Sequence, residues 1–192
     1  MRRTAGFVLN SLPIVIVLAS GRGARFLASG GTTHKLQAAL GNKTVLKHTL
    51  DAVLQSGLPW HLEQADHPHM GDSISAAVTS TADQAGWLIL PGDLPLIQAE
   101  TILAVAGALR EHEVVVPMYF GQRGHPVGFN TSCRQALMNL QGADGARLII
   151  AARQSVELPV TDVGSVTDID TVTDLQRAER IFYSRPKLQM AN

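Results

Sequence analysis

The chain has 192 residues, of which 45% are hydrophobic, so it is long enough to bury one sizeable core. Sixteen lysines and arginines balance sixteen aspartates and glutamates, and this zero net charge excludes a long-range basic field that would attract nucleic acid or an anionic membrane. The single cysteine, Cys133, excludes an internal disulfide framework and a cysteine zinc cluster, and it indicates the reducing cytoplasm.

The amino-terminal segment MRRTAGFVLNSLP combines two arginines with apolar residues, which are features of a signal peptide. Asn10, Ser11 and Pro13 interrupt the apolar run, which is far shorter than the roughly 20 residues that span a membrane. We therefore expect neither a signal peptide nor a membrane anchor. We predict an extension at residues 1–12, a single domain at 13–184 and a tail at 185–192.

Strand and helix patterns alternate along the chain. Short apolar runs predict strands, three of them of the type buried on both faces of a parallel sheet, at 14–18, 60–63, 87–90 and 114–117. Apolar residues at helical spacing predict helices at 45–57, 73–86, 99–112, 132–140, 146–153 and 172–184. This alternation favours a three-layer α/β fold, with an open, mostly parallel sheet and helices on both faces. Ligands of such sheets bind beyond the carboxyl ends of the strands.

The loop after the first strand, LASGRGARF at 18–26, has the features of a phosphate-binding loop. Gly21 and Gly23 allow backbone N–H groups to converge on an anion, and Arg22 and Arg25 add positive charge. The alternative is an ordinary glycine turn with solvated arginines. The dinucleotide fingerprint requires a third glycine where this chain has Phe26, so a nicotinamide enzyme is disfavoured.

The P-loop pattern also fails, because GNKT at 41–44 has Asn42 where a glycine must precede the lysine. A different anion site is therefore expected in this chain.

Two places in the sequence carry carboxylates that could bind a divalent metal ion. Asp93 directly follows the strand WLIL in PGDLP, where a carboxylate can hold Mg²⁺ against substrate phosphates, although Gly, Asp and Pro are also turn formers. Asp168 and Asp170 have the spacing of two that points both side chains the same way in extended chain. Thr171 and Asp174 resemble a helix capping box, which predicts a structural role for Asp174 and leaves Asp170 available to a ligand.

Six segments, which follow one another along the chain in the same order as in the family, resemble the signature of MobA-like nucleotidyltransferases, and most closely that of the molybdenum cofactor (molybdopterin) cytidylyltransferases. LASGRGARF is similar to the opening LAAG or LAGG motif, and Lys35 in HKL matches the signature lysine. PGDLP is similar to the metal-binding Gly-Asp-x-Pro, and DIDTVTDL at 168–175 matches the closing Asp-x-Asp-Thr-x-x-Asp-Leu. RGHPVGF at 123–129 and GADGAR at 142–147 resemble segments of the cytidylyl branch rather than the guanylyl branch.

The resemblance implies transfer of CMP from CTP to the phosphate of molybdenum cofactor, with Mg²⁺ as cofactor, pyrophosphate as leaving group, and a molybdoenzyme or its chaperone as recipient. The catalytic residues it implies are Arg25, Lys35, Asp93 and Asp170, with Asp93 and Asp170 as metal ligands. The nucleotide site it implies comprises Leu18, Ala19, Ser20, Gly21, Arg22, Gly23, Gly71, Ser73 and Gly92. The acceptor site it implies comprises His125, Pro126, Asp144, Gly145 and Arg147.

The chain departs from the family pattern in three places. Ser20 replaces the usual Ala or Gly, which adds a hydroxyl near the expected base site. The segment 27–34, LASGGTTH, is longer than usual, so Lys35 reaches the phosphates only if this loop folds back. The segment 45–73 is shorter than usual, and about one βα unit is expected to be missing.

The segment HLEQADHPHMGD at 61–72 is rich in histidine and acidic residues, and zinc binding is an alternative to a solvated loop near the site. Pro68 breaks any helical register there, which favours the loop. His34, His48 and His112 are expected to be surface residues.

Two other functions remain open from the sequence. The same fold could use GTP or a sugar or alcohol phosphate acceptor, or it could carry molybdenum cofactor without catalysis. Pyrophosphate release by the purified protein separates enzyme from carrier.

Overall fold

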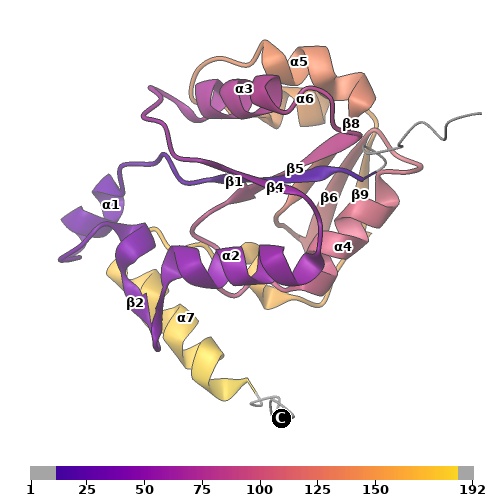
Figure 1. Cartoon of the computed structure of the whole chain (residues 1–192). Coiled ribbons are helices and arrows are strands. Elements are labelled where there is room, and N and C mark those ends of the chain that lie inside the picture. Colours follow the sequence, from indigo (N-terminus) through magenta and orange to yellow (C-terminus); the bar gives the residue numbers. More distant parts are fainter. Residues whose placement is uncertain (1–11, 186–192) are drawn as a thin grey trace, which may run out of the picture.

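The computed structural model describes residues 12–185, which form one mixed sheet and the helices that cover it (Figure 1). Most of the predicted extension and tail therefore lies outside the described residues. The strands follow the order β4-β1-β5-β8-β6-β7, and β9 pairs with β6. They comprise β1 (Ile14–Leu18), β4 (Trp60–Glu63), β5 (Gly86–Pro91), β6 (Val114–Tyr119), β7 (Gln122–Arg123), β8 (Val127–Asn130) and β9 (Ser155–Pro159). A separate two-stranded sheet joins β2 (Ala39–Leu40) to β3 (Lys43–Thr44).

The predicted mostly parallel sheet is confirmed, with an antiparallel strand near its centre. β1 pairs in parallel with β4 and with β5, and β6 pairs in parallel with β9. β8 lies antiparallel between β5 and β6. The strands β1 and β5 therefore end at the same edge of the sheet, and the loops that follow them meet there.

Helices cover both faces of the sheet (Figure 1). On one face lie α2 (Val45–Ser56), α4 (Ala99–Ala108) and α7 (Val172–Ser184), and on the other lie α3 (Met70–Ser80), α5 (Arg134–Met138) and α6 (Arg147–Ala152). The short helix α1 (Ala24–Ala28) precedes three 3-10 helices, η1 (Lys35–Gln37), η2 (Thr131–Cys133) and η3 (Val163–Val166). This is the three-layer α/β arrangement that the sequence predicts.

The core forms because each central strand is apolar on both faces. In β1, Val15 and Val17 pack toward α2 and α4, whereas Ile14 and Ile16 pack toward α3 and α5. In β5, Trp87 is fully buried on the α3 side, where its indole N–H donates to the Thr81 hydroxyl (3.1 Å) and carbonyl (3.3 Å). A continuous apolar run thus yields a strand buried on both faces.

Several helix boundaries differ from those predicted. The helix predicted at 73–86 begins at Met70, so Ser73 lies within it, and it ends at Ser80. The helix predicted at 99–112 ends at Ala108, and the one predicted at 132–140 is divided into η2 and α5. The last helix is confirmed at 172–184, and its capping box between Thr171 and Asp174 is present.

The segment between α2 and α3 contains one strand, β4, which lies at an edge of the sheet. Within residues 12–185, no helix combines the length and the apolar character needed to cross a membrane. Cys133 is a buried free thiol at the end of η2.

Candidate active site

The candidate site lies where β1 and β5 end. The Gly92 N–H, just after β5, donates to the Leu18 carbonyl at the end of β1 (2.8 Å). A Cβ at Gly92 would lie 3.0 Å from that carbonyl oxygen, so glycine permits the close approach. Thr49 of α2 donates its hydroxyl to the Gly92 carbonyl (3.0 Å) from below. These contacts place Asp93 beside the loop that follows β1.

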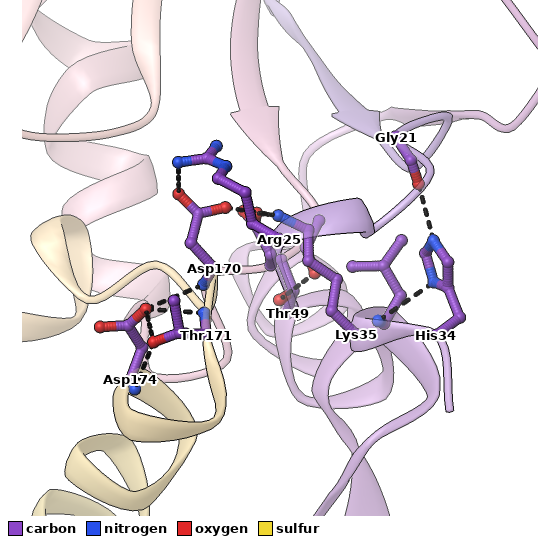
Figure 2. Close-up of polar contacts among 11 residues, drawn as sticks. Gly21, Arg25, His34, Lys35, Thr49, Asp170, Thr171 and Asp174 are labelled. Carbon is purple, nitrogen blue, oxygen red and sulfur yellow. Dashed lines mark hydrogen bonds and ion pairs between the residues drawn. The ribbon is translucent and has the colours of Figure 1, made fainter. Parts of the chain in front are cut away.

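A charge cluster occupies this junction (Figure 2). Lys35 Nζ lies 2.5 Å from Asp93 Oδ2 and 2.9 Å from Asp170 Oδ1, and all three side chains are largely buried. Arg25 of α1 adds an exposed cation, with Nη1 at 2.8 Å from Asp170 Oδ2. The structure therefore brings together all four residues that the family resemblance implies as catalytic.

The backbone before α7 brings Asp170 to this cluster. Ile169 is fully buried, and its N–H donates to the Asp93 carbonyl (3.0 Å). Asp174 Oδ2 accepts from the N–H of Thr171 (2.7 Å) and from that of Asp170 (3.3 Å). Because Asp174 is occupied with capping α7, Asp170 is the carboxylate that faces the site.

Electrostatics in the cluster are dominated by the carboxylates. Burial lowers the pKa of Lys35, but Asp93 and Asp170 outweigh burial and raise that pKa above its ordinary value. Desolvation and the nearby carboxylates of Asp93, Asp170 and Asp174 raise the pKa of Asp168. Lys35 is thus held as a cation in a strongly negative pocket.

The donor set fits a hard divalent cation. Asp93 Oδ1 is buried and has no hydrogen-bond partner among the described residues, so one oxygen of this carboxylate is free to ligate. Mg²⁺ typically takes one or two protein carboxylates and completes its shell with substrate phosphates and water. In the described part of the chain no three His, Cys, Asp or Glu side chains form a metal-holding group. Asp93 and Asp170, both in contact with Lys35, are the two carboxylates at this junction that could contribute ligands.

The opening loop, residues 19–23, runs from β1 to α1 along the same junction. Ser20 Oγ lies 2.8 Å from Oγ of Ser73 in the first turns of α3. Gly23 precedes α1 with φ of +64°, a left-handed conformation that favours glycine. The loop therefore lies between the amino-terminal part of α3 and the helix that carries Arg25.

A cavity of about 460 Å³ opens between this loop and α3. Its walls include seven of the predicted site residues, namely Leu18, Ser20, Gly21, Arg22, Lys35, Ser73 and Asp93. The same cavity is lined by Leu36, His67, Pro68, His69, Met70 and Pro91, which the sequence did not single out as site residues. The segment 27–34 folds back, as expected, and brings the Lys35 side chain to Asp93 and Asp170.

The residues implied for the acceptor fall into two groups. Burial lowers the pKa of the His125 imidazole despite the opposing effects of the Asp93 carboxylate and the Ile89 backbone, so a neutral ring is favoured. Its Nδ1 is buried without a partner among the described residues. Asp144 and Arg147 instead have exposed side chains, on a segment packed against α3.

The amino-terminal end of α3 fits closely against that segment. The Gly71 N–H donates to the Gly142 carbonyl (2.9 Å), and a Cβ at Gly71 would lie 2.8 Å from this oxygen. A Cβ at the buried Gly145 would lie 3.1 Å from Met70 Sδ, a residue of the cavity wall. The segment 141–147 therefore packs against the end of α3 whose Met70 and Ser73 line the cavity.

Residues 51–157, more than half of the chain, match the model of the MobA-like NTP transferase domain. This chain belongs to that family. The matched range contains Asp93, His125 and the segment 142–147, whereas the opening loop, Lys35 and Asp170 lie outside it.

Solved structures share the fold of this MobA-like chain at low sequence identity. Rv0371c from Mycobacterium tuberculosis H37Rv has a TM-score of 0.74 and 21% identity, covering 88% of this chain and 99% of that one, and it is also known as a complex with manganese. A nucleotidyl transferase from Methanothermobacter thermautotroptrophicus (Mth528) has a TM-score of 0.74 and 16% identity, covering 91% and 99%. Molybdopterin-guanine dinucleotide biosynthesis protein A from Archaeoglobus fulgidus has a TM-score of 0.66 and 18% identity, covering 90% and 100%.

The histidine-rich segment of this MobA-like chain forms a wall of the cavity. The buried carboxylate of Glu63 lies 3.2 Å from His67 Nε2 and 3.5 Å from His61 Nε2, and it accepts the Ala65 N–H (3.0 Å). Burial raises the pKa of Glu63, but these three contacts outweigh burial and lower it. The segment therefore serves to order the loop after β4.

His34, which is expected at the surface from the sequence, is half-buried and contacts the opening loop beside the cavity. Its Nε2 lies 2.6 Å from the carbonyl oxygen of Gly21 in the opening loop (Figure 2). No helical or strand periodicity signals this contact, because it joins two loops 13 positions apart. Its position directly before the signature lysine is the signal that could have drawn attention to it.

Proposed function

We propose that this MobA-like nucleotidyltransferase transfers CMP from CTP to the phosphate of molybdenum cofactor, in the presence of Mg²⁺. The observation that carries the proposal is the cluster of Lys35, Asp93 and Asp170, of which Lys35 and Asp93 lie at the wall of a cavity that the opening loop also lines. Phosphoryl transfer requires cations that bind phosphates and carboxylates that bind a metal ion. Lys35 supplies the first, Asp93 and Asp170 could supply the second, and the glycine backbone of the opening loop lies beside Lys35 and Asp93.

In the proposed reaction, an oxygen of the acceptor phosphate attacks the α-phosphorus of the nucleotide. The bond from α-phosphorus to the bridging oxygen breaks, and its electron pair leaves with pyrophosphate. Rate enhancement then comes from holding two polyanions in line and from stabilising charge on the leaving group. No covalent intermediate on the protein is needed.

The chain's own residues supply the positioning. Backbone groups of the opening loop would contact the nucleotide, with Ser20 and Ser73 near the base. Arg25 and Lys35 would exchange their contacts with Asp170 for contacts with the triphosphate. Asp93 and Asp170 would hold Mg²⁺, which neutralises phosphate oxygens and so reduces their mutual repulsion.

The choice of CTP and of molybdenum cofactor rests on the Gly-His-Pro segment at 124–126 and on GADGAR at 142–147, which resemble the cytidylyl branch. A protein of this fold from Archaeoglobus fulgidus is named for molybdopterin-guanine dinucleotide biosynthesis, which supports a molybdopterin-type acceptor and makes GTP the competing nucleotide.

The test is pyrophosphate release by purified protein given Mg²⁺, each of CTP, GTP, ATP and UTP in turn, and either molybdenum cofactor or a sugar or alcohol phosphate as acceptor. We expect release with CTP, and a loss of roughly 100-fold or more in Asp93→Asn, since a group that stabilises transition-state charge is removed. Asp51→Asn is the control, because Asp51 also pairs with lysines, Lys43 and Lys47, outside the cavity. Release only with sugar or alcohol phosphates would refute the acceptor, and nucleotide binding without release would refute catalysis.

A further inference from the structure

His34 connects two segments that line the cavity, the opening loop and η1. We propose that its imidazole is a positioning residue, which fixes the opening loop relative to Lys35 so that both are ready to contact one nucleotide. This inference rests on the proposed function of the cavity as a nucleotide site. His34 does not line the cavity itself, so it would act through Gly21 and Lys35.

Both nitrogens of the His34 ring are used. Nδ1 accepts the Leu36 N–H (3.3 Å) at the start of η1, and Nε2 lies 2.6 Å from the Gly21 carbonyl oxygen. An amide N–H can only donate and a carbonyl can only accept, so Nδ1 carries the lone pair and Nε2 carries the proton. One neutral tautomer therefore satisfies both contacts, and within residues 12–185 the hydrogen bonds of the ring go to backbone groups of two segments.

The ring also packs against Gly23, the residue that precedes α1. A Cβ at Gly23 would lie 3.3 Å from His34 Cδ2 and Nε2, and 3.4 Å from the backbone nitrogen of Lys35. Gly23 thus allows the loop to lie flat on the imidazole and on the chain beside it. Since α1 carries Arg25 and η1 begins with Lys35, His34 contacts the chain next to the start of both helices, whose cations meet at Asp170.

The irregular segment between α1 and η1 explains why such a link is needed. Residues 29–34 separate α1 from η1, and a connection without regular structure leaves the position of Lys35 weakly determined by the chain alone. Ser29 anchors one end, where its hydroxyl oxygen accepts the Val172 N–H (2.9 Å) at the start of α7. His34 anchors the other end.

Two substitutions separate the two contacts of His34. In His34→Asn the amide oxygen can still accept the Leu36 N–H, as Asn130 does for Ser132 (2.9 Å) and Asp162 does for Gly164 (2.8 Å) at the other 3-10 helices. The shorter side chain cannot reach Gly21. His34→Ala loses both contacts.

The control is His48→Asn, because His48 Nε2 lies 2.7 Å from the Leu40 carbonyl oxygen and packs on Phe182, and neither residue lines the cavity. We expect His34→Asn to raise the Kd for CTP and Mg²⁺ by roughly fivefold, the effect of one lost hydrogen bond, with little change in kcat. His34→Ala should raise the Kd further and also lower kcat, because Lys35 is displaced. His48→Asn should lower the unfolding temperature without changing the Kd.

Each outcome decides the inference. An unchanged Kd in His34→Asn, or an equal rise in His34→Asn and His48→Asn, overturns the positioning role of His34. In that case the proposed function still stands, provided that the wild-type protein binds CTP. Failure of the wild-type protein to bind any nucleoside triphosphate overturns the proposed function and the inference together. An independent readout is the ¹⁵N spectrum of the imidazole in the free wild-type protein, where the Nε2–H tautomer is expected and the Nδ1–H tautomer contradicts the geometry.

Discussion

The ammonium group of Lys35 lies 2.5 Å from the Asp93 carboxylate, and the same group bridges to Asp170 at 2.9 Å. One lysine thus lies between the two carboxylates that we propose as metal ligands. A divalent cation at these oxygens competes with Lys35 for the same negative charge. Phosphates that draw Lys35 away would therefore favour metal binding, so nucleotide and metal are expected to bind cooperatively.

Replacing Lys35 by Met tests this competition. Without nucleotide, Lys35→Met should bind Mn²⁺ roughly tenfold more tightly, because the competing cation is removed, whereas pyrophosphate release should fall. The unfolding free energy should fall by about 3 kcal/mol, since two carboxylates lose their counter-charge in a largely buried site. Electron paramagnetic resonance of free Mn²⁺ measures the affinity, and denaturant unfolding measures the stability. Lys43→Met is the matched control, because Lys43 pairs with Asp51 (2.7 Å) away from the cavity. Equal Mn²⁺ affinity in both variants would contradict the competition.

Ser20 tests whether the departure from the family's Ala or Gly affects the base. Its hydroxyl lies 2.8 Å from that of Ser73 at the cavity wall. In Ser20→Ala we expect the ratio of kcat/KM for CTP to that for GTP to change roughly fivefold, the effect of one hydrogen bond. Ser80→Ala is the control, since Ser80 donates to the Ala77 carbonyl at the far end of α3. An unaltered ratio in Ser20→Ala means that the hydroxyl has no part in choosing the base.

Glu63 predicts a dependence of stability on pH. A carboxyl whose pKa is lower in the folded state stabilises the protein above its unfolded pKa of about 4.3, and this stabilisation is lost as the pH falls through the folded pKa. Glu63→Gln should therefore be less stable than wild type at pH 7 by on the order of 1 kcal/mol, and the difference should shrink below pH 4. Urea unfolding at both pH values measures it. A difference that grows on acidification would show that Glu63 does not have a lowered pKa.

Gly71 predicts a steric effect at the border of the cavity. In Gly71→Ala the new Cβ would lie 2.8 Å from the Gly142 carbonyl oxygen, a contact with backbone that cannot yield without moving the segment 141–147. We expect a loss of about 1–3 kcal/mol in unfolding free energy, typical of overpacking. Gly107→Ala in α4 has no atom within 4 Å of the new Cβ, so it should be neutral or stabilising by up to about 1 kcal/mol. Calorimetric unfolding compares the two, and equal effects would contradict the close fit.

Elements with strong local signals were predictable from the sequence. The apolar run of β1 and the apolar spacing of α7 each have one compatible structure, and both were predicted with their observed bounds. β8 was not predicted, because four residues with Gly128 inside them carry no strand period. Its place between β5 and β6 is decided by tertiary packing of Phe129 and Val127 in the core.

The site shows the same division between local and spatial signals. Asp93 and Asp170 follow from motif position, since each lies next to an element that the sequence predicts. His34 owes its place to a contact with Gly21, 13 positions away in another loop, which no spacing rule encodes. The loop after β4 is ordered by a local contact of Glu63 with His67, four residues apart but outside any helix, so helical spacing does not predict it. The start of α3 at Met70 was also missed, because Ser73 has the residue type of a cap but bonds Ser20 and the His69 carbonyl from within the helix.

The sheet places the chain's two tryptophans in opposite environments, so the intrinsic tryptophan fluorescence contains two distinguishable signals. Trp87 is fully buried in β5, whereas Trp60 is 41% exposed in the edge strand β4, so their emission should lie at shorter and longer wavelength respectively. Neither lines the cavity, so a bound nucleotide does not stack on either indole. The shorter-wavelength emission of Trp87 should then change only when the protein unfolds. If added nucleotide changes the longer-wavelength emission of Trp60, the change shows that β4 has moved together with the loop that follows it at the cavity wall.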